Sequence, residues 1–369
     1  MWFSARSCLV AAALFYASNA LPQATSADDS TSDGASAPVA CNNSPSLCSR
    51  RYNEVTHLGA HNSYALRDAS TDNSISGNQY LNATRALDAG LRLLQVQTHQ
   101  GDTTLQLCHS SCSLLDAGPL EDWLKLINTW MNENPNEVVT LLVVNADNAV
   151  PADFQSALVQ SGLSERSYVP TTAGATADWP TLQTMIDSNT RFVSFVTNLD
   201  YDATAAPAVL PEFDYVFETP FDVQELDGFN CTLDRPSGLD SATNALSQNY
   251  LSLANHFKYS SLGTLGISVP DEDNIETVNS KSISEVGALG THLDACRQEW
   301  GGVPNFVLVD FFNAGETIVA LDSINDVSDA EGRTQPEDGG SGAGLNAAGR
   351  LHSTSFGALV AFGAAVFLL

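Results

Sequence analysis

Positive charge is scarce in this chain of 369 residues, which has only 15 lysines and arginines against 43 aspartates and glutamates. Only three of the 15 are lysines, and no run of basic residues occurs anywhere in the sequence. A nucleic-acid partner is excluded, because contacts with phosphates need clustered lysine and arginine. Adsorption to an anionic lipid surface is disfavoured for the same reason. A net charge of −28 is typical of a solvent-exposed protein, because repulsion between molecules of like charge keeps the protein soluble.

Long apolar runs are also missing, since none reaches the roughly 20 residues that a membrane-spanning helix needs. Two shorter runs lie at the ends of the chain. Residues 9–17 follow Arg6 and lead into Ser18-Asn19-Ala20, a pattern that predicts a secretory signal peptide over residues 1–20.

The second apolar run, residues 355–369, ends the chain without a charged residue. Small residues around Asn346 and a short polar spacer precede it, which is the order of a glycosylphosphatidylinositol (GPI) attachment signal. We predict attachment at Asn346, removal of residues 347–369, and a secreted protein that a lipid anchor holds at the outer leaflet of the plasma membrane. The alternative is a tail-anchored helix, but the run is short for a span and has no basic flank.

Cysteine is present in an even number once Cys8 leaves with the signal peptide, since the chain has seven. In an oxidising compartment an even set favours disulfides, and local spacing predicts the pairs Cys41–Cys48, Cys108–Cys112 and Cys231–Cys296. Other pairings remain open, and a zinc site is a weaker alternative because no pair of C-x-x-C elements occurs. N-glycosylation sequons stand at Asn42, Asn82 and Asn230.

Two polar segments bound the central part of the chain. Residues 21–40 are predicted to be disordered, and residues 326–346 to form a flexible stalk rich in glycine, serine and acidic residues. Residues 41–325 have no other low-complexity break, so we predict one domain there. Its strand candidates are 54–58, 92–97, 103–108, 138–144, 191–197, 215–218 and 305–311, and several are apolar on both faces.

Helical patterns alternate with these strands, most clearly over residues 119–134, whose apolar residues recur at helical spacing. Alternation of strands and helices over this length predicts an α/β fold of the TIM-like barrel type. A doubly wound open sheet is the alternative, but no glycine-rich nucleotide loop follows the first strand.

Polar residues gather where the predicted strands end, which is where barrels of this kind build their sites. Because carboxyl ends of parallel strands share one rim, we expect these side chains to lie near one another. The candidates are His61, Asn62, Gln95, Gln97, His99, His109, Asn145, Asp147 and Asp310.

The segment His57-Leu58-Gly59-Ala60-His61-Asn62-Ser63 resembles the first signature of the phosphatidylinositol-specific phospholipase C X-domain family. The core of that signature is a Gly-Thr/Ala-His-Asp/Asn-Ser turn. Residues 90–97 resemble the family's second strand, and Leu107-Cys108-His109 its second histidine. The similarity covers residues 50–150 well and extends more loosely to 310–313. It implies a single-domain phosphodiesterase barrel, closer in layout to the bacterial enzymes than to the multidomain cytosolic ones.

This resemblance assigns roles to individual residues. His61 would be the base on the inositol 2-hydroxyl, and His109 the acid for the diacylglycerol oxygen, tasks that suit groups with a pKa near working pH. Asp310 would orient the base histidine, and Asn62 would hold the phosphate or, as in the metal-dependent branch, a calcium ion. The implied substrate is phosphatidylinositol or the inositol phosphodiester of a GPI-type lipid.

The chain departs from the family pattern at Gln95, Gln97 and Asn145. Bacterial members place an arginine at the position of Gln97, and calcium-dependent members place acidic residues at all three. A calcium site built from Asn62, Asn145 and Asp147 would be weak, because calcium prefers carboxylates. His99, as imidazolium, could supply the missing charge at the phosphate, and Gln95 and Gln97 would then bind the phosphate as amides. No other cofactor is implied.

Two other functions compete with catalysis by this site. Loss of one transition-state donor costs on the order of a hundredfold to a thousandfold in rate, which leaves room for an inactive surface protein that binds inositol lipids or wall glycans. Glycerophosphodiester phosphodiesterases share a related barrel, but they need a Glu-x-Asp metal pair where this chain has Gln95-x-Gln97.

Overall fold

The computed structural model describes residues 39–109, 112–113, 115–262 and 267–336. The predicted signal peptide, most of the predicted disordered segment, Asn346 and the C-terminal apolar run lie outside these residues. Within the described ranges, no helix combines the length and the apolar character that crossing a bilayer requires.

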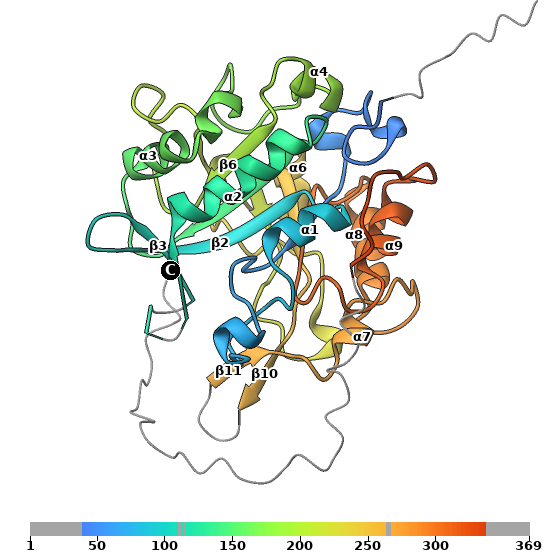
Figure 1. The fold of residues 1–369 in the computed structure, drawn as a ribbon. Helices are drawn as coiled ribbons and strands as arrows, with labels where there is room; N and C mark the ends of the chain where they lie inside the picture. Colours follow the sequence, from blue (N-terminus) through green and yellow to red (C-terminus); the bar gives the residue numbers. More distant parts are fainter. Residues whose placement is uncertain (1–38, 110–111, 114, 263–266, 337–369) are drawn as a thin grey trace, which may run out of the picture. The chain divides into compact units, whose positions relative to one another are not determined.

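The centre of the fold is a sheet with a path of eight parallel strands (Figure 1). Its order is β7 (Val209–Pro211), β6 (Phe192–Val196), β5 (Val139–Asn145), β2 (Leu93–Gln100), β1 (His57–Ala60), β12 (Phe306–Val309), β9 (Leu251–Asn255) and β8 (Val216–Glu218). β3 (Leu105–Cys108) pairs antiparallel with the end of β2, and β4 (Asp116–Pro119) pairs with β3.

The two outer strands of this path, β7 and β8, are joined by only the four residues of α5 (Glu212–Tyr215). Such a connection spans at most about 17 Å, so the two edges of the sheet lie close together. The sheet therefore curls into a barrel, and the predicted α/β barrel is confirmed.

Helices cover the outside of the sheet. The longest are α2 (Leu120–Glu133), α8 (Leu289–Trp300) and α3 (Pro151–Ser161). The predicted helix over 119–134 is thus present, and its apolar face is buried against the sheet. The other helices are α1 (Ala83–Ala89), α4 (Leu182–Asp187), α6 (Ala242–Ser247), α7 (Ile275–Val278) and α9 (Thr317–Ile324), and a separate hairpin consists of β10 (Tyr259–Leu262) and β11 (Ile267–Pro270).

Side chains of the strands alternate between two hydrophobic clusters. Leu94 and Val96 of β2 belong to the cluster beneath the helices, whereas Leu93 belongs to the cluster inside the barrel. Phe195 of β6 and Phe306 of β12 fill the same interior from different sides of the sheet. Because the interior is packed with large apolar side chains, the polar residues that follow the strands are left to the rim at their carboxyl ends.

One strand prediction is corrected by a short turn before β1. The candidate strand over 54–58 begins only at His57, because Tyr52–Glu54 form a 3-10 turn. The Glu54 carboxylate accepts a hydrogen bond from the Arg51 amide at 2.9 Å, and this contact closes the turn.

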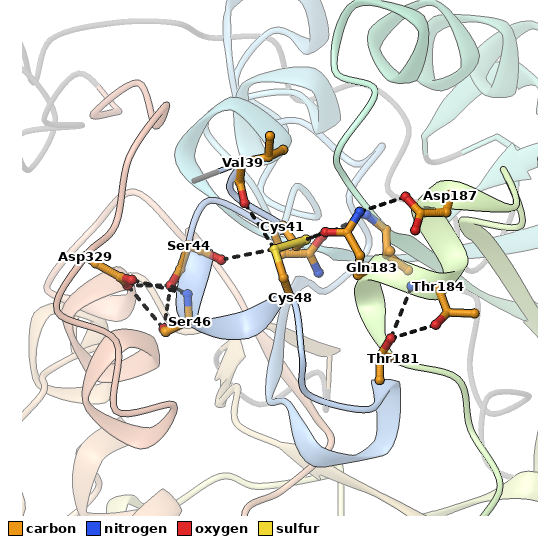
Figure 2. The surroundings of a disulfide bond; sticks show 12 residues. Val39, Cys41, Ser44, Ser46, Cys48, Thr181, Gln183, Thr184, Asp187 and Asp329 are labelled. Atoms are coloured by element: carbon orange, nitrogen blue, oxygen red, sulfur yellow. Dashed lines mark hydrogen bonds between the residues drawn. A yellow bond between two sulfur atoms is a disulfide. The ribbon is translucent and has the colours of Figure 1, made fainter. Parts of the chain in front are cut away.

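The three predicted disulfides, Cys41–Cys48, Cys108–Cys112 and Cys231–Cys296, are all present. Figure 2 shows the first of them, in the segment that precedes β1. Of the predicted glycosylation sites, Asn82 and Asn230 are exposed. Asn42 is 5% exposed and its side-chain oxygen accepts from the Val138 amide at 2.7 Å, so the folded chain has no room for a glycan there.

The first part of the predicted stalk, residues 326–336, is fastened to the domain. The Asp329 carboxylate accepts hydrogen bonds from Ser44 and Ser46 (Figure 2). Arg333 forms an ion pair with Asp322 at 2.7 Å, and the amide of Glu331 donates to a backbone oxygen of the N-terminal segment. Ion pairs and hydrogen bonds thus order a stretch whose composition alone predicted flexibility.

Candidate active site

His61 and Asp310 form a buried pair at the rim of the barrel. They follow β1 and β12, which are neighbours in the sheet with Ala60 opposite Val309. His61 Nδ1 lies 2.9 Å from Asp310 Oδ1, and the two residues are 7% and 2% exposed. With Nδ1–H donating to the carboxylate, Nε2 carries the free lone pair, which is the state a general base requires.

Two asparagines extend this pair into a closed network. Asn78 Nδ2 donates to Asp310 Oδ1 at 3.0 Å, and Asn78 Oδ1 accepts from Asn62 Nδ2 at 3.2 Å. The side-chain nitrogen of Asn62 also lies 3.2 Å from His61 Nε2, to which it can donate a hydrogen bond. Within the described part of the chain, Asn62 Oδ1 and Asp310 Oδ2 have no hydrogen-bond partner, so two buried acceptors remain for a ligand.

The backbone is strained directly after both members of the pair. Asn62 has a φ of 43° and Phe311 a φ of 45°, in the left-handed region that a bulky residue such as phenylalanine rarely adopts. The Gln79 side chain stabilises both turns, because its amide donates to the His61 carbonyl at 2.7 Å and to the Val309 carbonyl at 3.0 Å.

Gln95 of β2 and Phe257, which follows β9, hold the His61 turn from two further sides. Phe257, just after β9, stacks on the His61 imidazole with ring centroids 3.8 Å apart. The side-chain oxygen of Gln95, on β2, accepts a hydrogen bond from the backbone amide of Asn62 at 2.5 Å. Gln95 therefore positions the turn itself.

His109 follows β3 inside the loop that the Cys108–Cys112 disulfide closes. Burial, with a smaller contribution from the nearby His61, lowers the pKa of His109 to about 4. His61 is thus close enough to affect the charge of His109, and His109 is neutral at pH 7 in the unliganded chain. An anion beside it would favour its protonated form.

A second network lies farther along β2. His99 Nδ1 is 3.3 Å from Asp147 Oδ1, and His99 Nε2 is 3.2 Å from the Gln97 amide nitrogen. The other oxygen of Asp147 accepts from the Gln100 amide at 2.8 Å. The His99 ring thus lies between the Asp147 carboxylate and the Gln97 side-chain amide.

The predicted calcium ligands do not form a matching donor set. The Asn145 side chain is used by its own loop, since its oxygen accepts from the Ala149 amide at 2.8 Å and its nitrogen donates to Ala149 and Asn198 carbonyls. Both oxygens of Asp147 are engaged as well. Only Asn62 of the three offers an unpartnered oxygen, and calcium binds through several oxygens, mostly carboxylates. No step below is routed through calcium.

Arg92 cannot supply charge to the site. It lies just before β2 at the opposite end of the barrel, where its guanidinium binds Glu137 at 2.7 Å and Asn43 at 2.6 Å. It is 3% exposed and holds three segments together.

The structure thus brings the predicted residues into two neighbouring networks. His61, Asn62, Gln95 and Asp310 form the first, and Gln97, His99 and Asp147 form the second. Asn78, Gln79 and Phe257 were missed, although each contacts a predicted residue. Asn78 and Gln79 lie in a polar loop without periodicity, and Phe257 follows β9, a strand that the sequence analysis did not identify.

The chain has relatives among known proteins. The model of the PI-PLC X family matches residues 47–325. A PI-PLC X domain-containing protein 1 from Arthroderma benhamiae is 34% identical over 287 residues, which cover 77% of this chain and 89% of that relative. An uncharacterized secreted protein from the same fungus is 36% identical over 278 residues, 74% of this chain, although the match spans only 60% of that relative's length.

Among solved structures, a phosphatidylinositol-specific phospholipase C from Staphylococcus aureus that carries pentafluoro-phenylalanine aligns with a TM-score of 0.50. The alignment covers 75% of this chain and 94% of that one at 11% sequence identity. At this identity the likeness concerns the fold.

Proposed function

This chain belongs to the PI-PLC X family, and we propose that it cleaves the phosphodiester of phosphatidylinositol or of a GPI-type lipid by histidine acid–base catalysis. The observation that carries the proposal is the His61–Asp310 pair. A buried carboxylate that accepts from Nδ1–H holds Nε2 ready to take a proton, as in the serine protease triad. A structural histidine on the barrel rim would not need this arrangement.

The reaction follows from the two histidines. His61 Nε2 takes the proton of the inositol 2-hydroxyl, whose oxygen attacks phosphorus and forms a cyclic inositol phosphate. The bond from phosphorus to the diacylglycerol oxygen breaks, and His109 donates the proton that this oxygen needs. Asp310 stabilises the imidazolium that forms at His61. The anionic phosphate itself favours protonation of His109, whose pKa of about 4 in the free chain would otherwise keep it neutral.

Charge on the phosphate oxygens needs a positive partner in the transition state. We assign this role to His99, which lies between Asp147 and Gln97. The side-chain amides of Gln97 and Asn62 would add hydrogen bonds to the phosphate. A single partly exposed imidazolium is weaker than an arginine fork, so turnover is expected to be slow.

A second candidate function is favoured by the neutral amides Gln95, Gln97 and Asn145. The Gln95 side chain is engaged by the backbone amide of Asn62, and that of Asn145 by the backbone of its own loop, a use that stabilises the fold without serving catalysis. The same pocket could then bind inositol lipids or wall glycans without cleaving them.

We also propose that the protein is secreted and held at the cell surface by a lipid anchor. This proposal is supported by the apolar runs at both chain ends and by the three disulfides. The relative from Arthroderma benhamiae that is named a secreted protein is consistent with it.

The test is turnover of phosphatidylinositol vesicles by the purified secreted chain, with calcium and with a chelator. We expect release of inositol phosphate that survives chelation and is abolished in His61→Ala. Glu299→Gln, an exposed change away from the site, is the control and should keep full activity. Equal, negligible release by the wild-type chain and His61→Ala, with binding of inositol phosphate retained, would support the binding protein instead.

A further inference from the structure

Two buried histidines outside the candidate active site face each other between the sheet and α8. His256 follows β9 and His292 lies on α8, and they are 0% and 4% exposed. His256 Nδ1 lies 3.0 Å from His292 Nδ1. The other ring nitrogen of each faces a backbone carbonyl. His256 Nε2 is 2.8 Å from the Val278 oxygen, and His292 Nε2 is 3.1 Å from the Asn230 oxygen.

Two neutral imidazoles carry too few protons for these three contacts. A carbonyl oxygen only accepts, so each Nε2 must carry a hydrogen to bond with its carbonyl. A neutral imidazole has one N–H, so the two Nδ1 atoms would then face each other as bare lone pairs. Moving a hydrogen to Nδ1 would only transfer the mismatch to a carbonyl. One added proton between the Nδ1 atoms completes all three hydrogen bonds, whereas a second would place two N–H groups against each other.

The groups that surround the pair are uncharged. The ring of Phe229 lies against both imidazoles, with centroids 4.1 Å from His256 and 5.6 Å from His292. Both sulfurs of the Cys231–Cys296 disulfide lie within 4.8 Å of a ring nitrogen of His292. The two backbone carbonyls complete the surroundings. Among the described residues, no carboxylate, lysine or arginine lies close enough to shift the pKa of either histidine.

Burial and hydrogen bonding act on the pair in opposite directions. Burial lowers the pKa of His292 to about 4 and that of His256 well below its usual range, where His292 adds to the effect. The third hydrogen bond favours the charged state and opposes burial. The pair should therefore take up its single proton below the ordinary histidine pKa of 6.5 and above about 4. Because the rings share this proton, they titrate as one unit.

On the side of the sheet, the pair is joined directly to the support of the base. The backbone amide of His256 donates to the Leu308 carbonyl at 2.9 Å, which fixes the chain at the end of β9. The next residue is Phe257, whose ring stacks on the His61 imidazole. A shift of the His256 ring therefore acts on the residue that sets the plane of the base.

On its other side, the pair is joined to the turn that carries Asp310. The carbonyl that His256 faces belongs to Val278, at the end of α7. The next residue, Asn279, donates through its side-chain nitrogen to the Asp310 carbonyl at 2.9 Å and to the Phe311 carbonyl at 3.1 Å. The contact between His256 and Val278 thus lies one residue away from the support of the carboxylate.

We infer that His256 and His292 are positioning residues for the base, and that one proton shared between their Nδ1 atoms completes the contacts that hold Phe257 and Asn279. The inference rests on the proposed function and adds a proton-dependent element to it. In the neutral pair one of the three contacts is repulsive, and the rings move apart. In the charged pair all three are hydrogen bonds, and His61 keeps its orientation.

The primary experiment is a ¹⁵N NMR titration of the histidine side chains in the whole secreted chain from pH 8 to pH 4.5. The variants His256→Gln and His292→Gln assign the signals. We expect both signals to change together, in a single step that corresponds to one proton for the two rings. Two separate steps, uptake of two protons by the folded chain, or no change over this range would overturn the inference.

The variant His292→Gln is also a matched functional test. A glutamine side-chain nitrogen carries two hydrogens, so it can donate to His256 Nδ1 and to the Asn230 carbonyl without an added proton. The other histidines titrate in both proteins, so the ratio of kcat in the wild-type chain to kcat in His292→Gln isolates the pair. We expect this ratio to rise roughly fivefold from pH 7.5 to pH 5, the effect of one hydrogen bond. A ratio that does not depend on pH would overturn the positioning role.

Glu299→Gln, an exposed change on the same helix, is the control for these kinetics. The ratio of wild-type kcat to that of Glu299→Gln should stay constant over the same pH range. A ratio that rises with Glu299→Gln as it does with His292→Gln would overturn the assignment of the effect to the histidine pair.

This inference and the proposed function can fail separately. A chain that cleaves no lipid would refute the catalytic proposal, but the NMR titration would still measure the pair. The ring resonances of Phe257 then report on positioning. We expect them to shift at the pH of the step in the wild-type chain and not in His292→Gln. The same shifts in both proteins would overturn the positioning role and leave the catalytic proposal untouched.

Discussion

The imidazole of His61 and the ring of Phe257 lie face to face, with centroids 3.8 Å apart and planes inclined by 6°. The carboxylate of Asp310 fixes the edge of the same imidazole at 2.9 Å. One contact sets the plane of the ring and the other its rotation within that plane. The direction of Nε2 is therefore determined before any substrate binds, which is the preorganisation that general base catalysis needs.

Replacement of Phe257 by leucine should reduce kcat roughly tenfold and leave KM nearly unchanged, because the imidazole loses its stacking partner but the substrate contacts remain. An aromatic contact is worth about 1 kcal/mol, so a small decrease in Tm is expected as well. Steady-state kinetics and calorimetry measure both effects. Phe217→Leu, which loses the contact with Trp300 away from the site, should lower Tm but not kcat. A parallel loss of kcat in both variants would mean that Phe257 acts through stability alone.

The variant Asp310→Asn keeps the size of the side chain but replaces the carboxylate by an amide. Its amide can donate to Nδ1, which favours the tautomer with the proton on Nε2 and removes the lone pair that the base needs. We expect kcat to fall by roughly a thousandfold. Asp322→Asn, which weakens only the ion pair with Arg333, is the control and should keep kcat. Activity of Asp310→Asn within a few fold of the wild-type value would show that the Asp310 carboxylate does not orient the base.

The pKa of His109 should rise when the site binds an anion. Burial holds it at about 4 in the free chain, and a bound phosphate favours the charged imidazolium. NMR titration of the imidazole carbon resonances with and without inositol 1-phosphate measures the shift, and His109→Gln assigns the signal. An unchanged pKa in the presence of saturating ligand would place His109 away from the phosphate.

Acidification should destabilise the fold through His57, which lies at the start of β1 and is 1% exposed. Burial lowers its pKa to about 4, below the value of 6.5 in an unfolded chain. The unfolded state thus binds more protons in this window, and stability is lost as the pH falls from 6.5 towards 4. At pH 5 the loss is on the order of 2 kcal/mol.

This loss is measured as the difference in Tm between pH 7 and pH 5, in the wild-type chain and in His57→Gln. Other titrating groups contribute equally to both proteins, so the wild-type chain should show the larger decrease. The same decrease in both would mean that His57 does not titrate in this range.

Much of the site could be predicted because its residues directly follow apolar strands. His61 and Asp310 are 249 positions apart, yet they meet because β1 and β12 pair in the sheet. A strand leaves a clear apolar run in the sequence, and the resemblance to the PI-PLC X family supplied the roles. The ends of the strands then placed Gln95, Gln97 and His99 on the same rim.

The residues that support His61 could not be predicted in this way. Asn78 reaches Asp310 from a loop whose path depends on hydrogen bonds such as that from the Phe311 amide to the Asn78 carbonyl at 2.8 Å. Phe257 comes after a strand, Leu251–Asn255, that has no β-branched or aromatic residue and so does not stand out from the surrounding sequence. The expectation that Asn145 binds calcium was not met for a related reason. Both the oxygen and the nitrogen of its side-chain amide are hydrogen-bonded within its own loop. A sequence does not show which acceptors are already occupied.

The attachment of Asp329 to Ser44 and Ser46 also has a mechanical consequence. Asp329 and Glu331 bind the segment that carries the Cys41–Cys48 disulfide, and this segment lies beside Arg92 and Val138, where strands of the barrel begin. A force applied to the chain beyond residue 336 therefore acts first on these contacts, where the two ends of the domain meet. His61 and Asp310, at the far end of the strands, are shielded from this load, so tension on a tether would leave the geometry of the base unchanged.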